Sequence, residues 1–436
     1  MIGLRPVLAK TWFALLYRDG WAGRASVRSR AAPWNAQRAD LGRKSRAPTR
    51  YAYRIYPSIG EVDPRRWVFA STGRPNLFMD PRFIATAQRS LRAARFWHVV
   101  FSTEAGVGVA SASLCLYRVD LALLAGKAMH KFLASLRRIY PKFLYVDVMF
   151  CGLPISVGGN SLSFSAGCDR ECVLDLLETI MGDLARQHRA HVRVFKEFTS
   201  DECESMDGLL ARGYQRASTP SMNLLEGRFA DFDDYCASLR SHYRNDIRRS
   251  VRKFARSDYV VCRLRNAHDV VEAYSDDVHL LYESVLQRAT HKLEHLPAEF
   301  FRELARSFPD MVSLTLVKHG DRVVAFNYAL SHADCYYFLF CGMDYRIHKE
   351  TGLYFNLMYR DLDHAFRDGL KLVQLGQASD RFKARIGCAT IPLFFYIKAE
   401  GLLGRLIKLG PPLLFPPHRP PRRMSVFRDA GSEDRA

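Results

Sequence analysis

Five arginine residues near the middle of the chain follow one another at intervals of four residues: Arg240, Arg244, Arg248, Arg252 and Arg256. Apolar residues beside them recur every three or four positions, which predicts one amphipathic helix over residues 231–257. The arginines would form a face about 24 Å long, and a guanidinium group can bind phosphate through two parallel hydrogen bonds. This face could bind a polyanion such as tRNA, a nucleotide-linked substrate or an anionic membrane surface. The alternative is a solvated basic face without a ligand.

A second group of residues lies at the predicted start of a helix. It consists of Lys349, Thr351, Gly352, Leu353 and Tyr354. Free N–H groups at a helix start, preceded by a glycine turn, can bind an anion and especially a pyrophosphate. The spacing approaches the Arg/Gln-x-x-Gly-x-Gly/Ala pattern of acyl-CoA acetyltransferases and departs from it at Lys349 and Tyr354. Thr351 could alternatively act only as a helix cap.

The positive charge of the protein is concentrated in three segments. The 436 residues include 64 Lys and Arg against 45 Asp and Glu, a formal net charge of +19. Residues 1–60 hold twelve basic and two acidic side chains, residues 402–436 hold seven and three, and residues 240–256 hold seven and one. The rest of the chain is therefore almost neutral, and an anionic partner would be bound by the ends or by the predicted helix.

The composition also limits the class of protein and its compartment. Apolar residues make up 48% and charged residues 25%, which excludes wholesale disorder and a coiled coil. The ten cysteines show no paired spacing, so we expect reduced thiols and a cytoplasmic protein. No apolar run reaches the ~18–20 residues that span a bilayer, so membrane association would be peripheral, at the inner face. His291, Glu294 and His295 match an inverted zinc-peptidase motif, but Pro297 predicts a helix that starts after them, so no metal is expected.

The order of predicted elements occurs twice in the chain, which indicates an internal repeat. Each half begins with short antiparallel strands, continues with an apolar strand that ends in Gly-x-Asp, and then has an amphipathic helix and another strand. The two triplets are Gly167–Asp169 and Gly342–Asp344. This order predicts an α/β protein with mixed α+β sheets, antiparallel at the start and parallel across the helix, in two lobes packed side by side. Residues 121–140 would be a helical insertion in the first half.

The segment boundaries follow from composition and from the repeat. Residues 1–59 are basic and residues 406–436 are Pro-rich and basic, so both ends are expected to be disordered tails. The first lobe is expected at residues 60–225 and the second at residues 226–405. The basic helix 231–257 would open the second lobe and form part of the junction between the lobes.

Four strings of residues in the second half carry a resemblance. They are Tyr243–Lys253, Cys341–Tyr345, Tyr354–Tyr359 and Leu375–Cys388. These strings resemble the FemAB-like, GNAT-related acyltransferases, and the resemblance covers about residues 95–400. It implies two tandem GNAT-type lobes, in agreement with the repeat. It also implies transfer of an acyl group from a thioester or an aminoacyl ester to an amine.

The resemblance implies where the active cleft lies. The Phe-Lys-x-x-x-Gly stretch would place Lys383 in the cleft of the second lobe, where it could offset phosphate charge or the charge of a tetrahedral intermediate. The alternative is an exposed loop cation. Asp344 and Tyr345 end the preceding strand and complete the candidate catalytic residues. Gln377 and Arg381 share the loop of Lys383 and join the candidate donor-binding residues of the 349–354 segment.

Two donors and one non-catalytic function remain open from the sequence. The helix-start segment favours acyl-CoA, with acetyl-CoA as the expected donor, and the acceptor would be an amine of a small molecule, a peptide or an envelope precursor. The arginine face and the bulky Tyr354 favour aminoacyl-tRNA and a Fem-type aminoacyl transferase. A protein that only binds RNA or an anionic surface would need the arginines but not Lys383.

Overall fold

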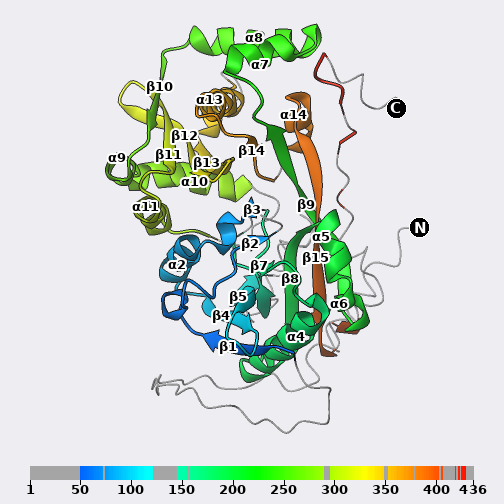
Figure 1. The fold of residues 1–436 in the computed structure, drawn as a ribbon. Helices are drawn as coiled ribbons and strands as arrows, with labels where there is room; N and C mark the ends of the chain where they lie inside the picture. Colours follow the sequence, from blue (N-terminus) through cyan, green and yellow to red (C-terminus); the bar gives the residue numbers. More distant parts are fainter. Residues whose placement is uncertain are drawn as a thin grey trace, which may run out of the picture.

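The computed structural model of the protein is built around one mixed sheet of 13 strands (Figure 1). It describes residues 50–71, 74–120, 145–155, 158–288, 295–347, 352–377, 379–401, 404–405, 418, 421–422 and 424–428. None of the helices in these ranges is long and apolar enough to cross a membrane. The predicted insertion at residues 121–140 lies outside the described residues.

The first lobe is formed mainly by the N-terminal half. Its strands in the large sheet are β1 (Ala52–Tyr56), β4 (Arg95–Ser102), β5 (Gly108–Asp120), β6 (Tyr145–Cys151), β7 (Leu162–Phe164) and β8 (Val192–Thr199). Its helices are α2 (Pro81–Ser90), α4 (Arg170–Gln187), α5 (Ser200–Met206) and α6 (Gly208–Ala211), with 3-10 turns η1 (Ile59–Glu61) and η2 (Leu77–Met79). A two-stranded ribbon joins β2 (Ala70–Ser71) to β3 (Arg74–Pro75).

The second lobe repeats this plan. Its strands are β10 (Tyr259–Leu264), β11 (Val312–His319), β12 (Arg322–His332), β13 (Cys335–Met343) and β14 (Leu372–Gln374). Its helices are α7 (Phe232–Ser238), α8 (Ser241–Ala255), α9 (Ala267–Ala273), α10 (Asp276–Arg288), α11 (Ala298–Ser307), α13 (Leu353–Arg367) and α14 (Asp380–Arg385). Two long strands, β9 (Gln215–Glu226) and β15 (Ala389–Ala399), lie between the lobes.

The strand order shows the tandem repeat directly. The sheet runs β1-β4-β5-β6-β8-β15-β9-β14-β13-β12-β11-β10, so the second half of the order mirrors the first. In each lobe four antiparallel strands are followed by one parallel pair, which is β6 with β8 and β13 with β14. The lobes exchange their last strands, because β9 pairs with β14 and β15 pairs with β8. The predicted α/β fold with two tandem lobes is thereby confirmed.

One equivalence drawn from the sequence is wrong. The strand that ends near Gly167–Asp169 is β7, which pairs only with β5 and lies off the main order of the sheet. The counterpart of β13 is β6, because each of these two strands pairs in parallel with the strand that follows its lobe's long helix. Asp169 caps the N-terminus of α4 instead, where its side chain accepts a hydrogen bond from the Cys172 N–H. Gly-x-Asp therefore marks different positions in the two lobes.

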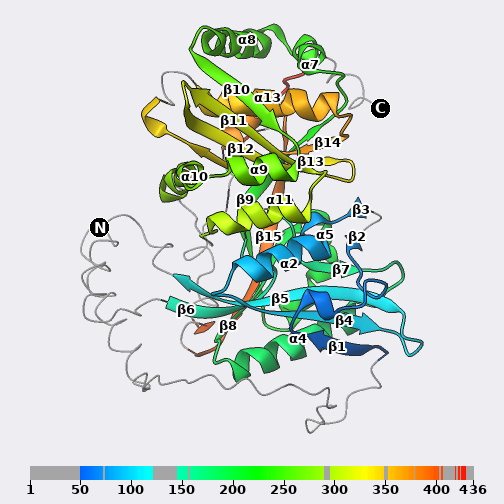
Figure 2. The same ribbon diagram turned by 90° about the vertical axis from the view of Figure 1, so that its left-hand side faces the viewer.

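Helices α2 and α11 form a contact between the lobes (Figure 2). Buried apolar side chains of both helices belong to one hydrophobic cluster that includes residues of both lobes. At the edge of this contact the hydroxyl groups of Thr86 and Ser307 lie 2.9 Å apart, and Arg89 pairs with Glu303 at 3.1 Å. The lobes therefore share a core and do not pack as independent bodies.

A buried hydrogen bond reinforces the contact between the lobes. His332 Nε2 at the end of β12 lies 3.2 Å from Oδ2 of Asp80, which also caps the N-terminus of α2. Arg82 donates to the same carboxylate at 2.8 Å. Burial alone would raise the pKa of Asp80, but the hydrogen bonds from His332 and Arg82 hold it well below its ordinary value.

The predicted single helix over residues 231–257 is two helices. The chain is extended at Leu239, between α7 and α8, and Leu239 forms an isolated β-bridge with Phe427. Pairing with this C-terminal segment satisfies backbone groups that a continuous helix would have bonded internally. Both helices pack on α13 at the outer end of the second lobe, away from β9 and β15 (Figure 1). The basic helix is therefore not part of the junction between the lobes.

The structure also places parts of the expected tails in the fold. Residues 52–56, which the composition assigned to the leader, form β1 and pair with β4 at the edge of the sheet. Residues 424–428, which fall in the expected C-terminal tail, pack against the second lobe, and Val426 is almost fully buried. These short apolar segments gain burial from partners that are far away in the sequence.

Candidate active site

The parallel pair of the second lobe opens into a split. Strands β13 and β14 are paired only between Cys335–Tyr337 and Leu372–Gln374. Beyond these residues β13 continues to Met343, whereas the other strand ends and the chain turns at Gly376, whose φ is +72°. Helix α14 follows this turn and carries Lys383.

Lys383 is buried inside this part of the second lobe, with only 1% of its surface exposed. Its Nζ donates to the carbonyl oxygens of Gly376 at 3.2 Å and Gln377 at 3.0 Å. Burial lowers the pKa of Lys383 to about 8, while Cys388 and Cys341 oppose this shift. Burial also raises the pKa of each of these two thiols to about 12, so both are neutral near pH 7. The interpretation of Lys383 as an exposed loop cation is therefore wrong.

The loop that binds Lys383 is fixed by the strands that the lobes exchange. Asn223 of β9 donates through Nδ2 to the Gly376 carbonyl at 3.2 Å and to Asp380 Oδ1 at 2.8 Å. Thr390 of β15 in turn donates to Asn223 Oδ1 at 3.3 Å. His418 Nε2 lies 2.7 Å from the other carboxylate oxygen of Asp380. We did not predict these residues, and the only signal in the sequence was a polar Asn inside the apolar end of a strand.

Asp344 lies at the end of β13, and its carboxylate is hydrogen-bonded to two arginine side chains. Its carboxylate accepts hydrogen bonds from Arg322 at 2.9 Å and Arg346 at 2.6 Å, and the residue is only 7% exposed. The hydrogen bond from Arg346 is the main cause that holds the pKa of Asp344 well below its ordinary value. Such a carboxylate stays ionised and is a poor proton acceptor near pH 7. The guanidinium group of Arg288 lies over the ring of the neighbouring Tyr345, 4.0 Å from its centroid.

The helix-start segment is only partly described. Lys349 and Thr351 lie outside the described residues. Gly352 is the N-cap residue of α13, with φ +65°, and as a glycine it has no side chain that could cap the first turn. Leu353 is fully buried, so only its backbone could reach a ligand. The ring of Tyr354 packs against Phe355 and Phe382 and is thus occupied by contacts within the protein.

The five predicted arginines do not form one uniform face. Arg240 precedes α8 in an extended conformation and donates to the carbonyl of Phe427, while Arg244 donates to the carbonyl of Leu239. The other three, Arg248, Arg252 and Arg256, are exposed, as are Arg249 and Lys253 beside them. Within the described residues, Arg248, Arg252 and Arg256 form no ion pair. Arg381, on α14, is also exposed.

The first lobe has a second buried lysine that we did not predict. Lys196 follows the parallel pairing of β6 with β8, and its Nζ donates to the carbonyls of Leu153 at 3.1 Å and Ile155 at 2.8 Å. The aliphatic part of the Lys196 side chain packs over Gly152, where a Cβ atom would lie only 2.5 Å from Lys196 Cγ. Both lobes thus have a buried ammonium group beyond their parallel pair, bonded to two backbone carbonyls. The sequence signal was the Lys196–Glu197 dipeptide beside the apolar residues Val194, Phe195 and Phe198 of this strand.

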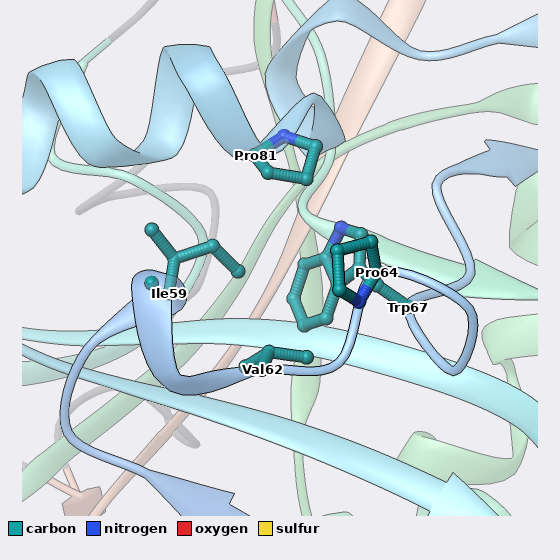
Figure 3. A pocket seen from close by; sticks show the side chains of 6 residues that line it. Ile59, Val62, Pro64, Trp67 and Pro81 are labelled. Carbon is teal, nitrogen blue, oxygen red and sulfur yellow. The ribbon is translucent and has the colours of Figure 1, made fainter.

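A separate cavity of about 220 Å³ lies in the first lobe near the start of α2 (Figure 3). Its lining is formed by Ile59, Gly60, Val62, Pro64, Trp67 and Pro81. None of these residues carries a titratable side chain, and most of the lining is apolar. Among the described residues there is no cluster of His, Cys, Asp or Glu that could hold a metal ion.

Residues 241–384, which carry most of the split and Lys383, match the family model described as "Acetyltransferase (GNAT) domain". This match confirms that the chain contains a domain of the GNAT-related acyltransferase superfamily. The repeated strand order places a second unit of the same plan before it. The search of curated proteins found no match.

The solved structures that match this chain include the following three proteins. "Crystal structure of FemX" has 11% identity and a TM-score of 0.46, covering 75% of this chain and 92% of that one. The tandem GNAT protein from the clavulanic acid biosynthesis pathway has 14% identity and a TM-score of 0.49, covering 80% and 99%. L-PGS from Bacillus licheniformis has 12% identity and a TM-score of 0.43, covering 78% and 98%.

Proposed function

We propose that this protein is an N-acyltransferase that moves an acyl group from acyl-CoA, with acetyl-CoA as the expected donor, to an amine. The acceptor would be a small molecule, a peptide or an envelope precursor. The observation that supports this most is Lys383, a cation buried inside a domain of the GNAT superfamily. A buried ammonium group is costly and is retained where its charge is used.

Lys383 has the hydrogen-bonding capacity that the proposal requires. An ammonium group has three N–H donors, and two of them are directed to the carbonyls of Gly376 and Gln377. The third could donate to the oxygen of a tetrahedral intermediate or of a phosphate, in a site of low polarity where such an interaction is strong. The roles of Asp344 and Tyr345 would be indirect, since arginine side chains engage both of them.

The start of α13 suits the phosphates of the donor. Its N-cap residue is Gly352, which has no side chain to cap the first turn and adopts a left-handed conformation that favours glycine. Backbone N–H groups and the helix dipole at such a position favour an anion. Because the Tyr354 ring packs on neighbouring aromatic side chains, its size alone does not argue against a pyrophosphate here.

Aminoacyl-tRNA is the alternative donor, and the exposed arginines of α8 favour it. Arg248, Arg252 and Arg256 together with Lys253 give this helix a strongly basic outer surface. The same surface would serve a protein that only binds RNA or an anionic membrane. Lys383→Ala separates these functions, because an enzyme needs this lysine whereas a binding protein does not. We place such a protein in the cytoplasm, at most peripheral to the inner membrane face.

A thermal-shift titration with CoA, acetyl-CoA and bulk tRNA distinguishes the donors. A ligand that binds the native state raises its melting temperature by mass action. Binding of tRNA through several arginines should weaken by orders of magnitude between ~50 and ~200 mM salt, whereas binding of acetyl-CoA should weaken far less. The matched control is Arg248→Ala/Arg252→Ala, which should lower the tRNA response only. Stabilisation by tRNA alone would reverse the donor assignment, and no response to any of the three would contradict both.

A further inference from the structure

Glu197 occupies an unusual position at the end of the parallel pair of the first lobe. In β8, Phe195 pairs with Tyr396 of β15 and Phe198 pairs with Phe394. Two residues of β8, Lys196 and Glu197, therefore lie opposite a single residue of the partner strand. This arrangement is a β-bulge. Bulges re-aim side chains and are frequent beside active sites. Here the bulge immediately follows the last parallel pair of β6 and β8.

The backbone of Glu197 is strained. Its φ is +67°, in the left-handed region, although glycine is the residue that adopts this conformation without cost. For another residue it costs of order 1–2 kcal/mol. Strain of this kind is found where the side chain has a use that outweighs the cost.

The carboxylate of Glu197 is buried at the junction of the lobes. The residue is only 4% exposed, and its Oε2 accepts a hydrogen bond from the Gly159 N–H at 3.1 Å. Its other oxygen lies 3.7 Å from Lys196 Nζ. Burial raises the pKa of Glu197, while Lys196, the backbone N–H groups of Gly159 and Gly158, and the Gln377 side chain oppose this rise.

Gln377 links Glu197 to the split of the second lobe. Its side chain lies against the Glu197 carboxylate, and its backbone carbonyl accepts the hydrogen bond from Lys383. Within the described residues, Gln377 Nε2 is buried and has no hydrogen-bond partner of normal geometry. A buried amide N–H group that is bonded only weakly within the protein can complete its hydrogen bonding with a ligand or a water. A carboxylate of one lobe and a weakly bonded amide of the other thus converge on one place.

We propose that Glu197 is the proton acceptor of the reaction, presented by the first lobe to the amine that the second lobe acylates. This inference rests on the proposed acyl transfer. Glu197 would bind the ammonium group of the acceptor and take one proton from it. Gln377 Nε2 would donate a hydrogen bond to the acyl carbonyl oxygen or to the acceptor. The first lobe is then a part of the catalytic site and not merely a structural copy of the second.

The step is balanced in atoms and charge. One N–H proton of the acceptor ammonium passes to the Glu197 carboxylate, which leaves a neutral amine with a free electron pair. This pair forms the new C–N bond with the thioester carbonyl carbon, and the C–S bond then breaks. The leaving thiolate takes up a proton, and loss of the second N–H proton from the amide nitrogen completes the exchange, with one proton released overall.

The test compares three variants of Glu197 with wild-type protein. Glu197→Gln keeps the shape and removes the charge, while Glu197→Gly removes the side chain and accepts the positive φ without strain. Lys196→Met/Glu197→Gln removes both buried charges. It replaces Glu197→Gln in the assay if the unpaired, buried ammonium group of Lys196 prevents that variant from folding. Glu171→Gln, at an exposed position on α4, is the matched control. Acyl transfer is followed as thiol release from acetyl-CoA with spermidine, glucosamine, glycylglycine or a lysine peptide as acceptor, between about pH 6 and 9.

We expect the variants of Glu197 to lose about 100-fold or more in kcat/KM near pH 7, as is typical for removal of a general base. The loss should shrink as pH rises, because the fraction of neutral amine in solution then increases about tenfold per pH unit. A residue with only a structural role would lower the rate by the same factor at every pH. The Glu197→Gly variant is decisive here, since it retains the bulge but not the carboxylate.

The outcomes separate this inference from the proposed function. Wild-type transfer together with a pH-dependent loss in the variants supports Glu197 as the proton acceptor. Wild-type transfer with an unchanged rate in Glu197→Gly, or with a loss that is the same at every pH, overturns the inference and leaves the transferase intact. Thiol release that no acceptor raises above the uncatalysed rate, even in wild-type protein, overturns both.

Discussion

Replacing Lys383 by Met should separate the stability of this protein from its activity. The ammonium group is buried in the second lobe, and burial lowers its pKa to about 8. In the unfolded chain the same group titrates near its ordinary pKa of about 10.4. Between these two values the unfolded state binds more protons than the folded state. The free energy of unfolding should therefore rise as the pH rises from about 8 to 10.

The magnitude follows from the two pKa values. Their difference corresponds to about 3 kcal/mol in the free energy of unfolding. Below pH 8 the lysine is charged in both states, so this burial cost is fully present and independent of pH. Met removes the cost but leaves the carbonyls of Gly376 and Gln377 without their donor, which costs about 1–3 kcal/mol. We expect the variant to differ from wild type by less than about 2 kcal/mol at pH 7, because the two effects oppose each other.

Urea denaturation followed by tryptophan fluorescence between pH 7 and about 9.5 measures this effect. The wild-type free energy of unfolding should rise across this range, whereas that of Lys383→Met should not show the same rise. Lys253→Met, at an exposed position on α8, controls for the loss of one positive charge. Parallel pH curves for wild type and Lys383→Met would refute the burial cost. A Lys383→Met variant that keeps its acyl transfer within a factor of ten would refute the role of this lysine in the reaction.

Three further perturbations test other parts of the structure. Gly342→Ala should lower stability by about 1–3 kcal/mol in thermal unfolding, because its Cβ would lie 2.7 Å from backbone atoms of α10; Gly60→Ala, whose Cβ would meet only Ser58 Oγ at 3.7 Å, is the control. Asp80→Asn should lower the melting temperature at neutral pH, and its difference from wild type should begin to shrink below about pH 4, where the ordinary carboxyl pKa lies, and vanish only well below that, because the folded-state pKa of Asp80 is strongly lowered. Arg248→Ala/Arg252→Ala should weaken binding to heparin or tRNA and reduce the slope of log affinity against log salt by about 2, with no change in stabilisation by acetyl-CoA; an unchanged slope would show that these arginines do not contact phosphate.

The local elements of this fold could be predicted from the sequence. Hydrophobic periodicity identified α4, α13 and most strands, because a helix or strand that covers a core must repeat its apolar residues at the period of its own geometry. The same periodicity revealed the tandem repeat and hence two lobes. It could not identify the partner of each strand, since β6 and β7 are both short apolar strands and only tertiary packing decides which of them pairs with β8. The exchange of β9 and β15 is undetectable by pattern for the same reason.

The candidate site, like the fold, could be predicted from the sequence only in part. The resemblance of residues 375–388 pointed to Lys383, but its burial depends on α14 packing against β9 and β15, which no local pattern shows. The arginine spacing predicted the outer surface of α8 in part, whereas the break at Leu239 arises from a bridge to Phe427 that is 188 positions away in the chain. Glu197 was visible only as a charged residue in an apolar strand. Its left-handed backbone, its contact with Gln377 and its place between the lobes exist only in the tertiary structure, because side chains from distant segments must meet before a buried charge acquires its partners.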